Sequence, residues 1–199
     1  MESQLNIIKE HLNKNNITFD KVANLFRLFN SAKTLIVGDI IIDRYTECTA
    51  IGKTSKTPTL SVKQNIINEY FGGASLFLNN LLKLGSEAEL ITVVGNDYGK
   101  EFIRRSSLKK KIFYVIDNSK PTTIKERFIV DGYKLLQRDI VENTNINDKI
   151  ENKIFLLFKK KVKYFNNVLI SDSRHGLLTP ILIKKIINYC KKKKYYTSC

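Results

Sequence analysis

Two carboxylates interrupt the most apolar stretch of the chain. Asp39 and Asp43 lie in the segment TLIVGDIIIDRY, residues 34–45, whose Leu, Ile and Val side chains predict a strand buried on both faces at the centre of a parallel sheet. An ionised carboxylate beside a core needs a partner or a cleft, because burying it unpaired is costly. Ligands of open α/β sheets bind at the carboxyl ends of strands, so Asp43 is the first candidate for a substrate-binding residue.

A pair of glycines supplies a second candidate. Gly72 and Gly73 come directly before ASLFLNNLLKLG, residues 74–85, which has the apolar spacing and glycine stop of a helix. Glycines at the start of a helix let the backbone approach a ligand closely and point free N–H groups at it. The pair by itself fits a plain strand-to-helix turn at least as well.

A third group of polar residues follows a predicted strand at residues 167–171. Asp172, Arg174 and His175 come directly after this strand and are therefore expected at the ligand-binding edge of the sheet. A functional and a purely structural role fit His175 equally well.

The elements around these residues alternate between strand and helix. Strands are predicted at residues 89–94 and 111–116, with a helix at 98–109 between them, which indicates a doubly wound, mostly parallel α/β sheet. A helix at 148–160 precedes the strand at 167–171, and Thr179 is the expected N-cap of a last helix that begins at Pro180.

Two parts of the chain depart from this alternation. The segment PTTIKERFIVDGYKLLQRD, residues 121–139, alternates like two strands around an Asp131-Gly132 turn. We expect this hairpin to pair with a strand at residues 59–64 and to form a small antiparallel sheet that covers the ligand site as a lid. Before residue 30, two helices joined by a turn at 13–16 are expected as an N-terminal appendage.

Composition sets the broad class. The 199 residues fit one ordinary domain, and no run approaches the ~20 apolar residues of a membrane helix. The first residues lack an apolar signal core and the three cysteines, Cys48, Cys190 and Cys199, show no metal-ligand spacing, so we expect free thiols and a cytoplasmic location.

The net charge of +15 raises nucleic-acid binding as an alternative. Residues 151–199 carry twelve Lys and Arg against Glu151 and Asp172, so +10 of the total belongs to the C-terminal quarter of the chain. Because a basic stretch of this kind is usually just a solvated face, nucleic-acid binding ranks third among the functions considered.

Taken together, the segments resemble the ribokinase-like, or PfkB, family of carbohydrate kinases. The similarity extends over VGDIIIDRY, SKTPTLSV, FGGA, the ungapped GGASLFLNNLLKLGSEAELITVVGND, PTTIKERFIV and SDSRHGLLTP, in this order. It is nearest to the branch that contains the heptose 7-phosphate kinases and the sugar-kinase modules fused to nucleotidyltransferases. It covers most of residues 33–187.

The resemblance implies roles for particular residues. Asp43 would bind sugar hydroxyls, which leaves Asp39 structural, and Gly72 and Gly73 would line the sugar pocket with support from Asn80. Lys125 and Arg127 would approach the sugar or its existing phosphate, a task that suits neighbouring cations on one face of a strand. Where the family has Asn soon after the glycine pair, this chain has Leu76 and Phe77, which puts sugar contacts there in doubt.

The resemblance also implies ATP and Mg²⁺ for the complete enzyme. In the family, a glycine-rich GAGD-type segment of the C-terminal half provides the catalytic base and the phosphate-binding helix N-terminus. This sequence has no glycine after Gly176. We therefore assign no catalytic, cofactor-binding or metal-binding residue, and expect the C-terminal half of the kinase domain to be missing.

These inferences divide the chain into an appendage at 1–30, a partial kinase domain at 31–190 with lid segments near 57–65 and 121–140, and an aberrant basic tail at 191–199, as a frameshift would leave. The leading function is the sugar-binding portion of an ATP-dependent carbohydrate kinase that is inactive alone. The alternative is a non-catalytic sugar-binding module that works with a partner polypeptide. A homodimer formed through the lid is a further open expectation, and no membrane partner is expected.

Overall fold

A five-stranded parallel sheet, sheet A, forms the body of the protein in the computed structural model, which describes residues 2–54 and 57–198. Its strand order is β5-β4-β1-β8-β9, and every neighbouring pair is parallel. The strands are β1 (Lys33–Gly38), β4 (Glu87–Val94), β5 (Ile112–Ile116), β8 (Asn167–Ser171) and β9 (Tyr196–Ser198).

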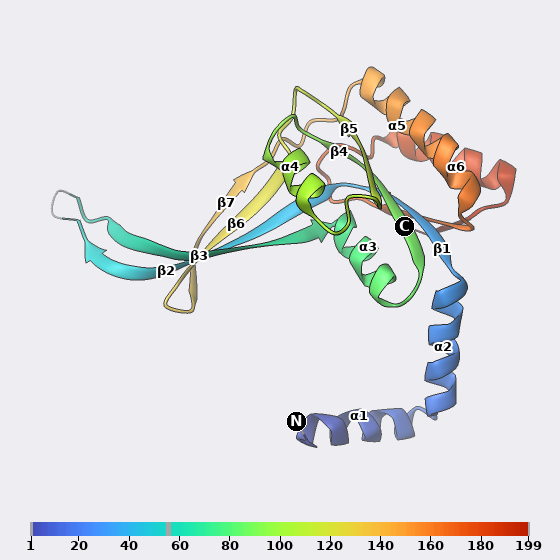
Figure 1. Ribbon diagram of the computed structural model, residues 1–199, viewed down its shortest axis with the longest axis horizontal. Helices are drawn as coiled ribbons and strands as arrows, with labels where there is room; N and C mark the ends of the chain where they lie inside the picture. The colour runs from blue at the N-terminus through green and yellow to red at the C-terminus, as the bar shows by residue number, and fades with distance from the viewer. Residues whose placement is uncertain (1, 55–56, 199) are drawn as a thin grey trace.

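Helices cover both faces of sheet A (Figure 1). The helices α3 (Ala74–Lys83) and α4 (Tyr98–Arg105) lie on one face, and α5 (Asp148–Lys161) and α6 (Pro180–Lys193) lie on the other, with the short 3₁₀ helix η1 (Val162–Tyr164) after α5. The fully buried β1 side chains alternate between the two cores: Leu35 and Val37 pack toward α5 and α6, and Ile36 packs toward α3. The expected doubly wound sheet is therefore confirmed.

A second sheet, sheet B, projects away from this body (Figure 1). Its order is β3-β2-β6-β7, and its strands are β2 (Ile40–Lys53), β3 (Leu60–Gly73), β6 (Thr123–Val130) and β7 (Tyr133–Ile140). The Asp131-Gly132 turn of the predicted hairpin is present, with both residues at positive φ. The expected pairing of the hairpin with β3 is wrong, because β2 lies between them and runs parallel to β6.

The stretch 34–45 is not one strand, and this is the main correction to the predicted fold. β1 ends at Gly38, and β2 begins at Ile40 in the other sheet. A side chain at Gly38 would collide with the carbonyl of Ser171, because its added Cβ would lie 2.2 Å from that oxygen. Asp39 therefore occupies the bend between the sheets, and Asp43 lies inside β2 of sheet B, not at the carboxyl end of a strand of sheet A.

The face of sheet B that points toward α4 is tied to the body by polar contacts. Arg44 Nε donates to Glu69 Oε1 at 2.8 Å, and the Tyr98 hydroxyl at the start of α4 donates to the other oxygen of Glu69. The guanidinium of Arg44 also lies 5.3 Å from the centre of the Tyr98 ring. Sheet B is thus attached to the body at its base and leaves its opposite face available.

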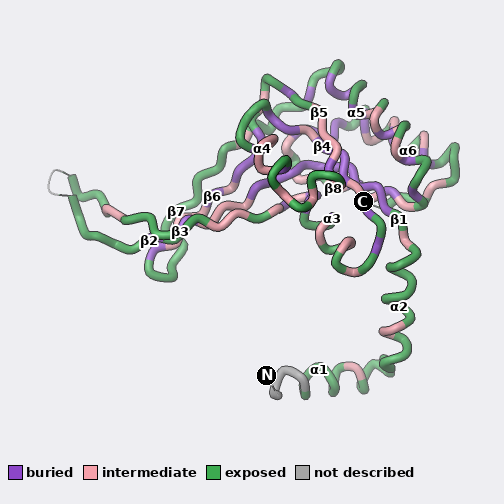
Figure 2. Tube along the Cα trace, viewed as in Figure 1, coloured by how far each residue is buried: buried purple, intermediate pink, exposed green. Residues whose placement is uncertain are grey.

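The two N-terminal helices extend away from both sheets (Figure 1). They are α1 (Glu2–Lys14) and α2 (Phe19–Ser31), and Thr18 is the N-cap of α2 as its position predicts. No described residue of α2 is buried, and Figure 2 shows the described parts of α1 and α2 as mostly exposed. The end of α2 is attached to the body by a 2.7 Å hydrogen bond from Ser86 Oγ to the carbonyl of Phe29.

Residues 191–198, where an aberrant tail is expected, complete a helix and form a short strand. α6 continues through Lys193, Lys194 adopts a left-handed conformation, and β9 then pairs with β8. Cys48 and Cys190 are buried free thiols, whereas Cys199 lies outside the described residues. None of the helices that the structure describes is long and apolar enough to cross a membrane.

Candidate functional site

Strand pairing brings the predicted lid residues onto one face of sheet B. Asp43 on β2 is directly opposite Lys125 on β6, and Tyr45 is opposite Arg127. Residues paired across neighbouring strands point to the same side of a sheet, and so do residues two apart along one strand. Asp43, Tyr45, Lys125 and Arg127 therefore share one face, which we call the polar face of sheet B.

An ion pair lies at the centre of this face. Arg127 Nη1 donates to Asp43 Oδ1 at 2.7 Å, with about a quarter of each side chain exposed. This hydrogen bond raises the pKa of Arg127 above its already high value. The Arg127 guanidinium also lies 5.2 Å from the centre of the Tyr45 ring, and Tyr45 packs edge-on against Tyr70.

Gly72 is required by the position of Asp43. A Cβ built at Gly72 would lie 2.0 Å from Asp43 Oδ2, so any side chain there would move the carboxylate. Gly73 has a different function in the fold, because it adopts a φ of 57° and its added Cβ would lie 2.5 Å from the carbonyl oxygen of Asp39. The glycine pair thus allows both a close approach to Asp43 and the tight entry into α3.

Asn80, the remaining predicted site residue, lies elsewhere. It is exposed in the last turn of α3, where its carbonyl accepts a hydrogen bond from Leu84. Among the described residues, no hydrogen bond joins its side chain to the polar face of sheet B. The structure therefore brings together Asp43, Gly72, Lys125 and Arg127, and not Asn80.

Asp39 organises the turn that follows β8. Its Oδ2 accepts the backbone N–H groups of Ser173 at 3.1 Å and His175 at 3.4 Å, and its Oδ1 accepts that of Leu177 at 3.4 Å. Only 5% of Asp39 is exposed, and this burial raises the pKa of its carboxyl group although the three N–H groups oppose the shift. These contacts fit the structural role predicted for Asp39.

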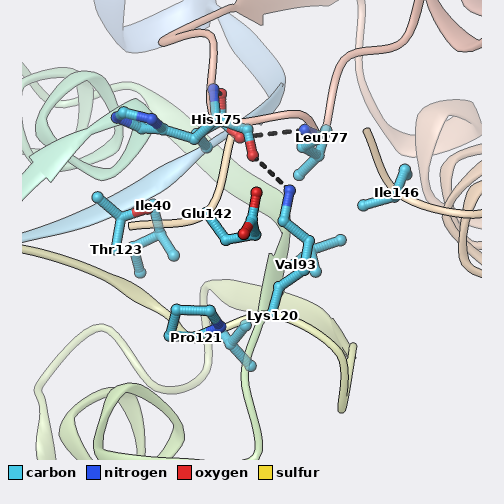
Figure 3. Close-up of a pocket in the computed structure, with 11 residues that line it drawn as sticks. Ile40, Val93, Lys120, Pro121, Thr123, Glu142, Ile146, His175 and Leu177 are labelled. Carbon is cyan, nitrogen blue, oxygen red and sulfur yellow. Dashed lines mark hydrogen bonds between the residues drawn. The ribbon is translucent and has the colours of Figure 1, made fainter. Parts of the chain in front are cut away.

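A small cavity lies beside Asp39, where the bases of the two sheets meet (Figure 3). Lys120 points into it and its Nζ donates to the carbonyls of Thr144 and, at 2.8 Å, His175. Burial lowers the pKa of Lys120. The cavity has a volume of only about 30 Å³, which is room for about one water and far too little for a sugar.

His175 faces the polar face of sheet B from the body. Its Nδ1 lies 2.8 Å from Asn143 Oδ1, and its Nε2 is buried without a hydrogen-bond partner among the described residues. Burial lowers the pKa of His175, and the positive charge of Lys125 acts in the same direction. Thr123, two residues before Lys125 on the same side of β6, lines the cavity together with His175.

The chemistry of this arrangement is that of a polyol and anion site. One carboxylate can accept hydrogen bonds from hydroxyl groups, two neighbouring cations can bind a phosphate, and two tyrosine rings border the face. The described residues contain no cluster of three His, Cys, Asp or Glu side chains that could hold a metal ion.

Sequence reasoning did not identify several residues of this region. Tyr45 and Tyr70 become neighbours only through the pairing of β2 with β3, and the register between these strands was not predicted. Lys120 and Asn143 belong to loops without regular pattern, so no periodicity could have revealed them. The Asp139 side chain, opposite Lys125 on β7, required only the hairpin register, which the Asp-Gly turn could have supplied.

Curated proteins resemble most of this chain in sequence. The chain is 29% identical over 163 residues to the bifunctional protein HldE of Aliarcobacter butzleri, a match that covers 79% of this chain and 34% of that protein. It is 31% identical over 174 residues to the bifunctional protein HldE of Helicobacter hepaticus, covering 85% of this chain and 36% of the relative. The chain thus spans about a third of the length of these curated relatives. No family model matches the sequence.

Solved structures share the fold. The phosphofructokinase-2 of Escherichia coli in complex with fructose-6-phosphate matches with a TM-score of 0.55 and 15% identity, over 84% of this chain and 53% of that one. A carbohydrate kinase from Agrobacterium tumefaciens matches with a TM-score of 0.56 and 16% identity, over 83% of this chain and 52% of that one. The predicted ribokinase-like α/β fold and the predicted resemblance are confirmed.

Proposed function

Because the chain is homologous to HldE proteins and has the fold of sugar kinases, we propose that it is the sugar-binding portion of an ATP-dependent carbohydrate kinase that acts in the cytoplasm. The complete enzyme would transfer a phosphoryl group from ATP to a hydroxyl of a sugar or sugar phosphate. In this proposal, sheet B is the lid and its polar face holds the substrate.

The convergence of Asp43, Gly72, Lys125 and Arg127 on the polar face of sheet B is the observation that supports this proposal most strongly. Four residues from three strands meet on the side of the sheet that carries Thr123 and faces His175. A purely structural lid would gain little from a half-buried carboxylate and two cations there, since charged groups are costly to desolvate. A hydroxyl-rich, anionic ligand would satisfy all of them.

Each residue has a defined task in the proposal. Asp43 would accept hydrogen bonds from sugar hydroxyls, and the missing side chain at Gly72 would leave room for that carboxylate. Lys125 and Arg127 would bind a phosphate that the sugar already carries. Gly73 would shape the entry into α3, and Asn80, exposed in the last turn of α3, would take no direct part.

ATP and Mg²⁺ belong to this proposal through the kinase resemblance. When bound, they would supply the phosphoryl group and neutralise its charge. The sequence has no glycine after Gly176, and the described residues offer no metal-binding cluster, so no residue of this chain is assigned to either group. We expect these 199 residues by themselves to bind a sugar phosphate without phosphorylating it.

A second candidate is a non-catalytic sugar-binding module that works with a partner polypeptide. Both candidates use the same polar face, and they differ in whether a complementing polypeptide restores phosphorylation.

Isothermal titration with sugar phosphates, including heptose and hexose phosphates, tests the proposed site. Lys125→Ala should weaken binding about tenfold, since a hydrogen bond to a charged group contributes about 1.5 kcal/mol or more. Lys134→Ala is the matched control, because Lys134 lies near the tip of the same hairpin and should not change the affinity. Equal affinities for all three proteins would remove Lys125 from the site, and ATP-dependent phosphorylation by the unmodified chain would contradict its inactivity.

A further inference from the structure

The proposed sugar-binding carboxylate already has a partner. Asp43 Oδ1 accepts a 2.7 Å hydrogen bond from Arg127, in a pair whose two side chains are 25% and 22% exposed. A sugar hydroxyl that approaches this oxygen must displace a cation. A neutral sugar offers no anion in return, so the displaced guanidinium would lose its counter-charge in a half-buried place.

Arg127 has unused binding capacity in the same arrangement. A guanidinium has five N–H donors in a planar fork, and only Nη1 of Arg127 donates to a side chain among the described residues. The group also lies against the face of Tyr45, at 5.2 Å from the ring centre, which restricts how it can turn. Its remaining N–H donors therefore stay available to a second anion on the polar face.

Lys125 is the neighbouring cation. Its side-chain ammonium group makes no hydrogen bond or ion pair in the part of the chain that the structure describes. It is directly opposite both Asp43 on β2 and Asp139 on β7. Asp139 accepts two hydrogen bonds from Gln137, at 3.0 and 3.2 Å, and does not neutralise Lys125 through an ion pair. An anion that reached the polar face would thus meet one free ammonium group beside one exchangeable guanidinium.

We propose that a phosphate monoester exchanges partners with Asp43: the phosphate takes over Arg127, and the freed Asp43 carboxylate then accepts the hydroxyls of the same sugar. This inference rests on the proposed function and concerns how its site distinguishes sugar phosphates from neutral sugars. The ion pair acts as a selectivity device, since only a ligand that brings its own anion can open it without leaving Arg127 uncompensated. Lys125 and Arg127 together form the phosphate subsite.

The test uses inorganic phosphate as the probe and the full chain as the protein. In the unmodified chain, Asp43 competes with phosphate for Arg127. Asp43→Asn removes this competition with almost no change in shape, so phosphate should bind about fivefold more tightly, as loss of a competing ion pair predicts. Titration followed by ¹H–¹⁵N NMR reports both the affinity and the location of binding.

Asp139→Asn is the control for charge. It removes one negative charge from the same face without freeing Arg127, so a change of about twofold or less is expected. Equal gains in the two variants would reduce the effect to general electrostatics and overturn the exchange, as would unchanged or weaker phosphate binding to Asp43→Asn. Arg127→Met should abolish the gain when combined with Asp43→Asn, and a gain that persists would also overturn it.

The exchange and the proposed function can fail separately. Binding of a sugar phosphate to the unmodified chain supports the proposed function whatever the phosphate titrations give. If sugar phosphates bind, but inorganic phosphate binds Asp43→Asn no more tightly than the unmodified chain, the proposed site is retained and the exchange is wrong. If inorganic phosphate binds Asp43→Asn more tightly but no sugar phosphate binds the unmodified chain, Arg127 can exchange partners and the proposed function is wrong. Thermal unfolding of each variant confirms that the comparison is made between folded proteins.

Discussion

Asp39 and Asp43 are four residues apart in one apolar stretch, yet they belong to different regions of the molecule. Asp39 is buried at the junction of the two sheets and is bound by three backbone N–H groups. Asp43 is part of sheet B, remains a quarter exposed and is bound by one side chain. Backbone donors are fixed by the fold, whereas a side-chain donor can be exchanged for a ligand.

The difference shows how a fold separates structural from functional charge. A carboxylate that satisfies a turn cannot release it without unfolding that turn, so Asp39 is unsuited to a ligand. Asp43 can change partners at the cost of one half-buried ion pair. The neighbouring glycines follow the same division, because Gly73 contacts the backbone of Asp39 and Gly72 contacts the carboxylate of Asp43.

The largest expected effect concerns the two carboxylates. Asp39→Ala should lower the free energy of unfolding by about 3 kcal/mol, because three backbone N–H groups lose their acceptor at a buried position. Asp43→Ala should lower it by less than about 1 kcal/mol, the usual range for a partly exposed ion pair. Urea unfolding monitored by circular dichroism measures both. Similar losses for the two variants would erase the distinction between the regions.

The two glycines allow the same comparison of the two regions, with smaller expected losses of stability. Gly73→Ala should cost about 2 kcal/mol of stability, because φ is 57° there and the new Cβ would lie 2.5 Å from a backbone oxygen. Gly72→Ala should cost less than about 1 kcal/mol, because the added Cβ would meet only the mobile end of Asp43.

Ligand binding should show the opposite order. Gly72→Ala moves Asp43 and should weaken sugar-phosphate binding about tenfold, whereas Gly73→Ala should retain most of the affinity in its folded fraction. Unfolding curves and titrations on the same preparations give both numbers. A Gly72→Ala protein with normal affinity would separate the Asp43 carboxylate from the proposed site.

The smallest expected effect is a pH dependence at the turn that Asp39 organises. The pKa of His175 is lowered in the folded protein by burial, so the unfolded state takes up a proton first as pH falls. Stability should therefore decrease as pH falls through about 6.5, the value of an unperturbed His, toward the lower pKa of the folded state.

His175→Asn should flatten this part of the profile. Lys125 and Lys120 also lower the pKa of His175, whereas Asp39 and Asp139 oppose the shift. Urea unfolding between pH 7 and about 5 gives the slope for both proteins. A steeper loss in His175→Asn than in the unmodified chain would assign the pH dependence to other groups.

Much of the fold could be predicted because its signals are local. Thr179 and Pro180 mark the start of α6, and the Asp-Gly turn marks the hairpin. The stretch 34–45 was predicted as one strand because nothing in a continuous apolar run indicates that the chain leaves one sheet and enters another. The bend at Asp39 depends on the close approach of Gly38 to Ser171, which lies in a strand distant in sequence. The expectation for residues 191–199 rests on composition, which gives no sign of the helix end and the short edge strand that lie at 191–198.

The candidate site could be predicted only in part for the same reason. Side chains on one strand, such as Lys125 and Arg127, share a face by their spacing alone. Their meeting with Asp43 needs the pairing of β6 with β2, which the sequence did not indicate, and the expected pairing with β3 was wrong. Asn80 was assigned only through the family resemblance, and the exposed turn where it lies became visible only in three dimensions.

The most direct test of the central claim is an NMR titration of the ¹⁵N-labelled chain with a panel of sugar phosphates. The account predicts that at least one of them shifts the amide signals of Asp43, Gly72, Lys125 and Arg127, and that these shifts disappear in Lys125→Ala combined with Arg127→Met. Shifts confined to the lysine-rich helices α5 and α6, or no binding of any sugar phosphate, would contradict it.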